Sequence, residues 1–279
     1  MMKVGIVGTG AVGPSIAQVF AQCGEVEIVY LCKGRECSIR NGKDALEQNL
    51  MQLVSKGKMP NEQMALILNK IKIGSKQILA DADLIVEAVA ENIEVKRLVF
   101  HELDQICKKE CIFTTNTSSL PIDMIGEGLT REVAGLHFFN PVPVMKLVEV
   151  IGSEKTSQHT LSILMEIARK IGKTPVEVHK SPGFIVNRLL IPMINEAIGI
   201  YAEGAASAEN IDMAMKLGAN HPMGPLALGD LIGLDVVLAI LEEMLQETGN
   251  AKYCPEKMLR QMVNDGKLGR KTGEGFYEY

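Results

Sequence analysis

The stretch Gly8-Thr9-Gly10-Ala11-Val12-Gly13, taken with the residues around it, indicates the fold of the first half of the chain. It directly follows an apolar run at residues 4–8 and leads into a helical pattern that starts with Pro14. Alone, a G-x-G-x-x-G motif is a weak signal. At the turn from a first strand into a helix, however, it is typical of a dinucleotide-binding βαβ unit.

Each glycine of the motif has a physical task in such a unit. Gly8 allows a tight turn, Gly10 lets a pyrophosphate come close, and Gly13 lets the helix pack on the strand. Backbone N–H groups at the start of the helix would bind the phosphates. The predicted cofactor-binding residues of the turn are Gly8, Gly10, Ala11, Val12 and Gly13. The alternative is a glycine turn with a structural role only.

Apolar runs alternate with helical patterns as far as residue 179. The predicted strands are residues 4–8, 27–31, 83–89, 111–115, 133–139, 146–151 and 175–179. Several are unbroken apolar runs, as in strands buried on both faces, and helical patterns such as residues 92–107 lie between them. This alternation indicates βαβ units, so we expect an α/β fold with a Rossmann-like, mostly parallel sheet.

Residues 41–70 form a helical insertion between the second and third predicted strands. It is long for a plain crossover, and a helical hairpin projecting over the sheet edge is one interpretation. Lys56 and Lys58 would then present positive charge to a ligand at the turn of the hairpin. A solvated turn explains two lysines equally well.

The pattern becomes helical almost throughout after His179. Ser181-Pro182 has the form of a helix N-cap followed by proline at the first helical position. The predicted helices are residues 183–202, about 207–217 and about 225–247, with more apolar residues than one bundle core needs. We therefore expect a Rossmann-like NAD(P)-binding domain at residues 1–181 and an all-α helical dimerisation and substrate domain at residues 182–279.

Composition and charge exclude several classes of protein. Of the 279 residues, 47% are hydrophobic and 23% are charged, which argues against a disordered chain. The formal net charge of −5 gives no sign of a nucleic-acid or membrane-surface partner, and the apolar stretches are too interrupted to span a membrane. The six cysteines lack the pattern of a disulfide scaffold or a zinc site, so we expect reduced thiols, no metal and a cytoplasmic protein.

His137 lies at the end of an apolar strand, where ligand clefts open in α/β sheets. If residues 133–139 and 146–151 lie side by side, His137 and Glu149 are equidistant from Pro143 and face each other. A glutamate in an apolar strand needs such a partner. The pair suits a dehydrogenase, in which an imidazole takes the hydroxyl proton as hydride leaves and a carboxylate fixes the tautomer of the imidazole. From spacing alone, catalytic and structural roles both stay open.

Five motifs are spread along nearly the whole chain. They are Asn116-Thr117-Ser118-Ser119, residues 136–150 (LHFFNPVPVMKLVEV), residues 182–188 (PGFIVNR), His221-Pro222-Met223-Gly224-Pro225 and residues 269–277 (GRKTGEGFY). With them the chain resembles the short-chain (S)-3-hydroxyacyl-CoA dehydrogenase family, and within it the bacterial 3-hydroxybutyryl-CoA dehydrogenases. The resemblance implies an oxidoreductase of fatty-acid and butyrate metabolism that interconverts (S)-3-hydroxybutyryl-CoA and acetoacetyl-CoA with a nicotinamide cofactor.

The resemblance also implies roles for four residues. The catalytic acid/base would be His137, and its orienting partner would be Glu149. Ser118 and Asn187 would hydrogen-bond the thioester and the 3-oxygen of the substrate, which implies chemistry in a cleft between the two domains. The simpler alternatives are a helix-capping turn for Ser118 and a buried amide for Asn187.

Further residues match family positions near the cofactor, namely Glu91, Lys96 and Asn116. A solvated helix start is an alternative for the first two. Because CoA is anionic, an acidic protein needs local cations to bind it, and Lys56 and Lys58 are the candidates. The implied partners are an acyl-CoA substrate and a second copy of the chain in a homodimer.

The sequence departs from the family at the cofactor ribose. An acidic residue about 20 positions after the glycine motif binds the ribose hydroxyls in NAD-type domains, but this chain has Lys33 and Arg35 there. Arg35 suits a 2′-phosphate, so we expect NADPH to be used at least comparably to NADH, with a modest lean towards NADP(H). Alternatively both side chains point to solvent, or Glu36 binds the ribose and restores NAD preference.

Two rival interpretations remain at this point. One is another hydroxyacid dehydrogenase of the same two-domain build, although such an enzyme would lack a reason to keep the histidine–glutamate pair together with the serine and the asparagine. The other is a catalytically silent dinucleotide-binding dimer with a structural or sensing role. Intact catalytic side chains argue against a silent protein, and only turnover decides.

Overall fold

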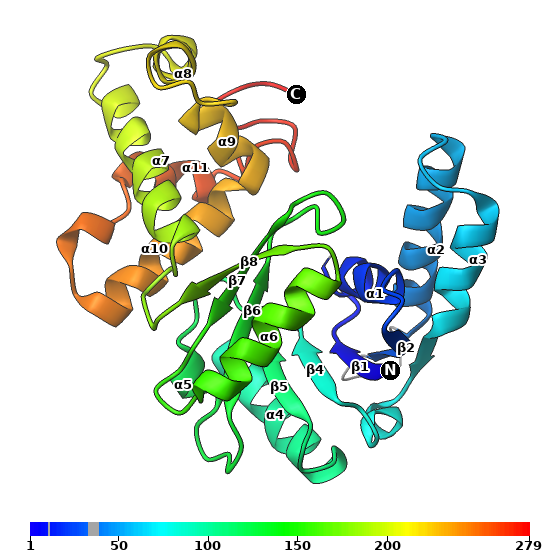
Figure 1. Ribbon diagram of the computed structural model, residues 1–279. Coiled ribbons are helices and arrows are strands. Elements are labelled where there is room, and N and C mark those ends of the chain that lie inside the picture. Colours follow the sequence, from blue (N-terminus) through cyan, green and yellow to red (C-terminus); the bar gives the residue numbers. More distant parts are fainter. Residues whose placement is uncertain (11, 33–38) are drawn as a thin grey trace. The chain divides into compact units, whose positions relative to one another are not determined.

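The computed structural model describes residues 1–10, 12–32 and 39–279 (Figure 1). The chain divides into two compact units, Met1–Lys180 and Ser181–Tyr279. The first unit combines a sheet with helices, and the second is helical. The predicted fold class, a Rossmann-like and mostly parallel sheet followed by an all-α part, is confirmed.

One sheet forms the centre of the first unit, and its strands run in the order β3-β2-β1-β4-β5-β6-β7-β8. Neighbouring strands are parallel except β6 and β7, so β7 and β8 run opposite to the others. The order reverses at β1, and the carboxyl ends of strands at such a point form the usual ligand crevice. The strands are β1 (Met2–Val7), β2 (Val26–Cys32), β3 (Ile71–Gly74), β4 (Leu84–Glu87), β5 (Ile112–Thr115), β6 (Val133–Phe138), β7 (Leu147–Ile151) and β8 (Thr174–Val178).

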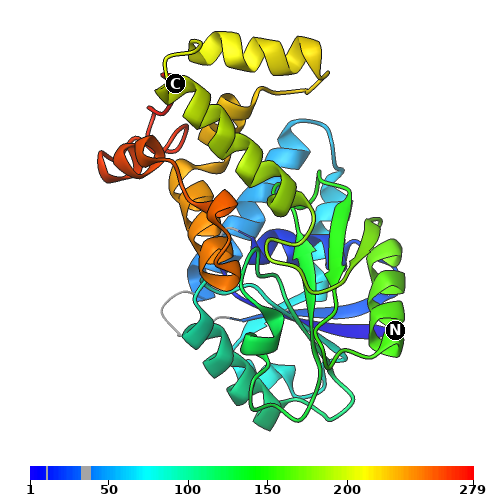
Figure 2. The ribbon, with the colours of Figure 1, turned by 90° about the vertical axis from the view of Figure 1, so that its left-hand side faces the viewer.

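Helices cover both faces of this sheet. Figures 1 and 2 show α1 and α6 on one face and α4 and α5 on the other. Apolar side chains from the first face and the sheet form one buried core, in which Ile6, Ile16, Leu136 and Leu164 are fully buried. The helices are α1 (Gly13–Ala21), α2 (Ile39–Ser55), α3 (Asn61–Lys70), the 3₁₀ helix η2 (Lys76–Leu79), α4 (Ile93–Ile106), α5 (Ile122–Ile125) and α6 (Gln158–Lys170).

All the predicted strands are present, with ends shifted by at most two residues, but β3 was not predicted. β3 pairs only with β2 among the described strands and is half-exposed, so it lacks the apolar run that marks a buried strand. The predicted helical insertion is a hairpin of α2 and α3, and Gly57 in its turn has a φ of +65°.

The second unit packs its helices around a separate apolar core. Ile194, Leu226, Leu241 and Met244 are fully buried there and come from three different helices. The helices are α7 (Val186–Ala202), α8 (Ala208–Gly218), α9 (Pro225–Ile232), α10 (Leu234–Thr248), the 3₁₀ helix η3 (Ala251–Tyr253) and α11 (Lys257–Asn264). Among the described residues, every helix is too short or too polar to cross a bilayer.

Two helix boundaries predicted for this unit are wrong. Ser181-Pro182 does not start a helix, because Gly183 and Phe184 have φ values of +68° and +57°, and α7 begins only at Val186. The helix predicted over residues 225–247 is two helices, since Gly233 with a φ of +103° ends α9 and starts α10. A positive φ interrupts a right-handed helix, and the apolar periodicity runs through both breaks without revealing them.

Candidate active site

The turn between β1 and α1 has the close contacts that a dinucleotide-binding turn requires. Gly8 has a φ of +136°, and a Cβ there would lie 2.2 Å from the carbonyl oxygen of Ala88. A Cβ on Gly13 would lie 1.9 Å from the carbonyl oxygen of Gly8, so only glycine lets the helix pack this closely on the turn. At Gly10, by contrast, a Cβ would meet no described atom within 4 Å, which leaves room for a ligand.

The start of α1 also fits a phosphate group. Val12 occupies the N-cap position, and among the described residues its side chain offers the helix no hydrogen bond. Backbone N–H groups of the first turn can therefore receive an anion, as they do at the pyrophosphate of a bound dinucleotide. Ala11 lies outside the described residues.

The structure places His137 opposite Glu149, as the spacing around Pro143 predicts. The two residues are direct partners in the antiparallel pairing of β6 with β7. His137 Nδ1 donates a hydrogen bond to Glu149 Oε2 at 2.8 Å, and the two residues are 4% and 1% exposed. A carboxylate only accepts hydrogen bonds, so this contact keeps a proton on Nδ1 and orients the ring.

A buried lysine supports the hairpin that joins these strands. Lys173 Nζ donates to the carbonyl oxygens of Val142 and Met145, the second at 2.7 Å. Burial, followed by the charge of Lys146, lowers the pKa of Lys173 below its ordinary value. The ammonium thus ties the turn between β6 and β7 to the residue that precedes β8.

Three charged residues meet at the carboxyl end of β4. Glu87 is fully buried, and Lys96 on α4 is 1% exposed. Lys96 Nζ donates to the two carboxylate oxygens of Glu87 at 2.9 and 3.1 Å and lies 3.2 Å from Glu91 Oε2. Lys96 is therefore buried in an ion cluster, and the solvated helix start considered for it is wrong.

Glu91 connects this cluster to the loop after β5. Its Oε1 accepts hydrogen bonds from the Thr117 hydroxyl at 2.6 Å and from the backbone N–H groups of Ser118 and Ser119 at 2.7 and 3.3 Å. Burial alone would raise the pKa of Glu91, but Lys96 and these donors outweigh it and hold the pKa below its ordinary value. Glu91 is a carboxylate at neutral pH and fixes the loop that carries Ser118.

Asn116 connects the same loop to the strand of His137. Its Oδ1 accepts a hydrogen bond from the backbone N–H of Phe138 at 2.8 Å. Its own N–H donates to the carbonyl oxygen of Glu87 at 2.7 Å. The ends of β4, β5 and β6 thus form one hydrogen-bonded edge, next to the glycine turn after β1.

The remaining predicted residues belong to other segments of the chain. Asn187 is half-buried in the first turn of α7, in the second unit. Lys56 and Lys58 are exposed in the turn between α2 and α3. Lys33 and Arg35 lie outside the described residues, as does Glu36.

Two residues of this edge, Glu87 and Lys173, were missed by the sequence analysis. The signal for Glu87 was present, because it is an acid in the apolar strand Leu84–Glu87, as Glu149 is in its own strand. Lys173 gave no comparable signal, since a lysine after a surface helix is ordinary.

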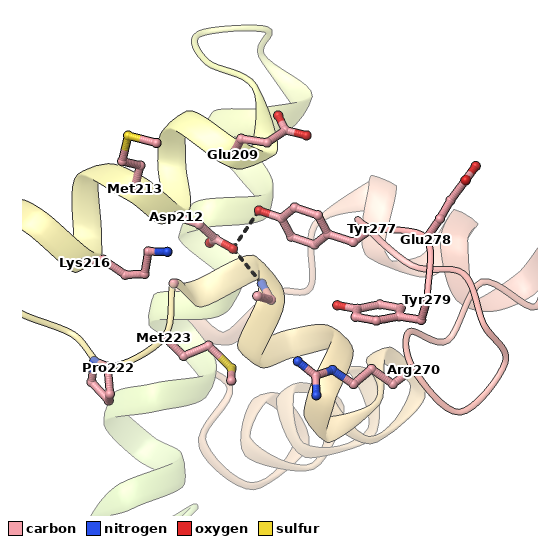
Figure 3. Close-up of a pocket in the computed structure, with 12 residues that line it drawn as sticks. Glu209, Asp212, Met213, Lys216, Pro222, Met223, Arg270, Tyr277, Glu278 and Tyr279 are labelled. Atoms are coloured by element: carbon pink, nitrogen blue, oxygen red, sulfur yellow. Dashed lines mark hydrogen bonds between the residues drawn. The ribbon is translucent and has the colours of Figure 1, made fainter.

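A pocket of about 520 Å³ opens within the second unit, between α8, the start of α9 and the C-terminal residues (Figure 3). On its wall, Asp212 accepts hydrogen bonds from the Tyr277 hydroxyl at 2.8 Å and from the Ala227 N–H at 2.9 Å. The Arg270 guanidinium lies 5.1 Å from the ring centre of Tyr279. The Tyr277 contact fastens the C-terminal segment to α8, and the Ala227 contact joins α8 to α9.

Comparisons with known proteins agree with this geometry. Residues 3–181 match the family model of the 3-hydroxyacyl-CoA dehydrogenase NAD-binding domain, and residues 183–279 match that of the C-terminal domain. The chain is 51% identical to 3-hydroxybutyryl-CoA dehydrogenase of Clostridioides difficile, over 100% of this chain and 99% of that protein. It is 42% identical to the human mitochondrial hydroxyacyl-coenzyme A dehydrogenase, over 99% of this chain and 90% of that protein.

A solved structure shows the same similarity. The crystal structure of (S)-3-hydroxybutyryl-CoA dehydrogenase from Ralstonia eutropha matches with a TM-score of 0.94 and 41% identity, covering 100% of this chain and 99% of the other. Both family models and these full-length relatives lead to one conclusion: the chain belongs to the 3-hydroxyacyl-CoA dehydrogenase family.

Proposed function

We propose that the protein interconverts (S)-3-hydroxybutyryl-CoA and acetoacetyl-CoA by hydride transfer with a nicotinamide cofactor. The observation that carries the proposal is the buried pair of His137 and Glu149 at the carboxyl edge of the sheet. The relatives named 3-hydroxybutyryl-CoA dehydrogenase in Clostridioides difficile and Ralstonia eutropha support this choice of substrate.

In the reducing direction His137 acts as the acid. When bound, a nicotinamide cofactor would supply the hydride for C3 of the acyl group. His137 in its charged form protonates the 3-oxygen, and Glu149 stabilises the imidazolium and keeps the ring oriented through Nδ1. In the oxidising direction the neutral imidazole takes the hydroxyl proton.

Other residues of the proposed site bind rather than transfer protons. Ser118 and Asn187 hydrogen-bond the thioester and 3-oxygen region of the substrate. Lys56 and Lys58 contribute positive charge for the phosphates of CoA. The roles of Ser118 and Asn187 rest on the family positions and on the loop geometry around Ser118. The role of the two lysines rests on their exposed positive charge at the turn of the hairpin and on the negative charge of CoA.

The proposed cofactor site includes the glycine turn, Asn116, Glu91 and Lys96. The open space at Gly10 and the uncapped start of α1 support it for a dinucleotide. The buried cluster lies at the end of β4, next to β1 at the reversal of strand order, where dinucleotides bind in such folds.

We also propose that NADPH is used at least comparably to NADH, with a modest lean towards NADPH. The support is the pair of cations, Lys33 and Arg35, where NAD-type domains carry an acid. The test is kcat/KM for both cofactors in the wild type and in Lys33→Asp. We expect the substitution to shift preference towards NADH, and a strong NADH preference that it leaves unchanged would contradict the proposal.

The function itself is tested by following NADH and NADPH absorbance with acetoacetyl-CoA. We expect rapid oxidation of the cofactor and formation of the (S)-3-hydroxy product. Tight cofactor binding without turnover would instead favour the catalytically silent dimer. Turnover of free 3-keto acids but not of the CoA thioester would favour another hydroxyacid dehydrogenase.

We further propose that residues 1–181 bind the cofactor, while residues 182–279 form a homodimer and contribute to substrate binding. Large apolar side chains are exposed on successive helices of the second unit, including Leu217 at 79%, Met213 at 51% and Leu231 at 48%. Exposed apolar surface of this extent indicates an interface. Sedimentation of the full chain is expected to give a dimer. Leu217→Glu is expected to weaken the dimer, whereas Lys216→Glu is a matched exposed control, and a monomeric wild type would contradict the proposal.

A further inference from the structure

Glu87 is a fully buried carboxylate to which the proposed mechanism gives no task. Its oxygens accept hydrogen bonds from Val89 N–H at 2.7 Å and from the Thr115 hydroxyl at 2.7 Å, as well as from Lys96. Breaking a buried ion pair is destabilising, but apolar residues of similar volume often replace a whole pair without loss of stability. Stability alone therefore does not explain charge at this position, and the question is what the charge holds in place.

Glu87 determines where the ammonium of Lys96 sits. Both carboxylate oxygens of Glu87 accept from Nζ, at 2.9 and 3.1 Å, and Lys96 is 1% exposed. An ammonium group has only three protons to donate. Because Glu87 orients the ammonium of Lys96, the remaining N–H of that ammonium points in a fixed direction towards another acceptor. That acceptor is Glu91, whose Oε2 lies 3.2 Å from Nζ.

Glu91 depends on a fixed position of Lys96 more than a fully buried carboxylate would. Its side chain is 39% exposed, and an exposed carboxylate paired with a mobile cation gains little from the pair. Glu87 holds the ammonium of Lys96 in a single position. Lys96 in turn holds the carboxylate of Glu91 in a single position. The other oxygen of Glu91 then holds the backbone N–H groups of Ser118 and Ser119.

We propose that Glu87 is a positioning residue for the dehydrogenase reaction. It acts through Lys96 on Glu91, and through Glu91 on residues 117–119, the loop that presents Ser118 to the substrate. Its link to the reaction rests on the proposed function, because the substrate contact of Ser118 belongs to that proposal. Small displacements of positioning groups lower the rates of enzymes by up to about 10²-fold, so a loosened loop lowers kcat.

The first test needs no turnover. Glu87→Gln keeps the shape of the side chain and removes its charge, and backbone hydrogen exchange of residues 117–119 is measured in the full-length protein. We expect faster exchange there than in the wild type. Asp104→Asn is the matched control, because Asp104 lies on α4 like Lys96 but forms its ion pair with Arg131, at 2.5 Å. This variant is expected to leave exchange at residues 117–119 unchanged. Unchanged exchange in Glu87→Gln would overturn the proposal whatever substrate the protein takes.

The second test separates positioning from folding. With acetoacetyl-CoA, Glu87→Gln is expected to lower kcat roughly 10-fold while KM stays within about threefold of the wild type. Combined with Ser118→Ala, it is expected to lower kcat by much less than the product of the two single effects, since both act through one loop. Independent, multiplying effects would show that the cluster serves the fold only and would overturn the positioning role.

The two proposals fail in different ways. Absence of wild-type turnover with acetoacetyl-CoA would overturn the proposed function, while hydrogen exchange would still decide whether Glu87 holds the loop. Glu87→Asp provides a milder variant should the glutamine variant not fold. Its side chain keeps the negative charge but is shorter by one methylene group. We expect an intermediate increase in hydrogen exchange at residues 117–119. Wild-type exchange in this folded variant, together with wild-type kcat, would also count against the proposal.

Discussion

The two units both bury carboxylates, but they give them different partners. In the first unit, Glu149 faces the imidazole of His137 and Glu87 faces the ammonium of Lys96. In the second unit, Asp230 receives the backbone N–H groups of Phe276 and Tyr277, each at 3.0 Å. A carboxylate beside a titratable group can take part in proton transfer or move a charge. A carboxylate whose partners are backbone N–H groups and a tyrosine hydroxyl, as are those of Asp230, orders the chain instead.

Glycines show how closely the chain approaches the aspartates of the second unit. A Cβ on Gly275 would lie 2.1 Å from Asp230 Oδ1, and a Cβ on Gly224 would lie 2.2 Å from the Cβ of Asp212. Asp212 also receives the Leu226 N–H at 2.8 Å and, as Figure 3 shows, the Tyr277 hydroxyl. Both aspartates therefore serve to hold backbone, and five substitutions test this difference between the two units.

The largest effect is expected from His137. His137→Gln removes the group that exchanges the proton, so kcat should fall by roughly 10²-fold or more while the cofactor still binds. Steady-state rates with acetoacetyl-CoA give kcat, and NADH fluorescence gives the binding control. A kcat close to that of the wild type would contradict the acid/base role of His137.

A smaller loss of activity is expected from Glu149→Gln. The glutamine keeps the size of the side chain and part of the orientation of His137, but it no longer stabilises the imidazolium. We expect kcat to fall roughly 10-fold, less than in His137→Gln. The kcat of the double variant should be only slightly lower than that of His137→Gln alone. If the two substitutions instead lowered kcat independently, His137 and Glu149 would not act as a pair.

Asp212→Asn should change stability and not chemistry. Its new amide group faces donors, so we expect the free energy of unfolding to fall by about 1–3 kcal/mol with kcat within about twofold of the wild type. Urea unfolding and the acetoacetyl-CoA assay measure the two quantities. A large fall in kcat without loss of stability would show that the second unit uses its buried carboxylates chemically.

The smallest effects are opposite pH dependences of stability. The pKa of Glu91 lies below its ordinary value of 4.5, so its contribution is present above that pH and is lost as the pH falls through the lowered pKa. Burial, opposed by the N–H groups of Phe276 and Tyr277, raises the pKa of Asp230 above 3.8. Its contribution is therefore full below that pH and is lost as the pH rises through the raised pKa.

The directions of these two pH dependences are checked by measuring the free energy of unfolding in urea between about pH 3 and 6. Relative to the wild type, Glu91→Gln should lose stability most at the upper end of this range, and Asp230→Asn should lose it most at the lower end. Parallel curves for the two variants would contradict the assignment of opposite roles.

Features that depend on local geometry could be predicted from the sequence. The glycine turn follows from sterics within a few residues, as the contacts of Gly8 and Gly13 show. The pairing of His137 with Glu149 follows from spacing, because two antiparallel strands joined by a short turn have a register set by that turn. The fold class follows from the alternation of strands and helices.

Contacts that join separate elements could not be predicted from the sequence, because they depend on how those elements pack in the folded chain. The cluster of Glu87, Lys96 and Glu91 brings together the end of β4, the inner face of α4 and the loop after β5. No sequence period relates these positions, because the packing of α4 on the sheet sets which of its side chains reaches Glu87. The break at Gly233 was hidden for a related reason: apolar periodicity reports which face is buried, whereas a single positive φ redirects the chain without changing that pattern.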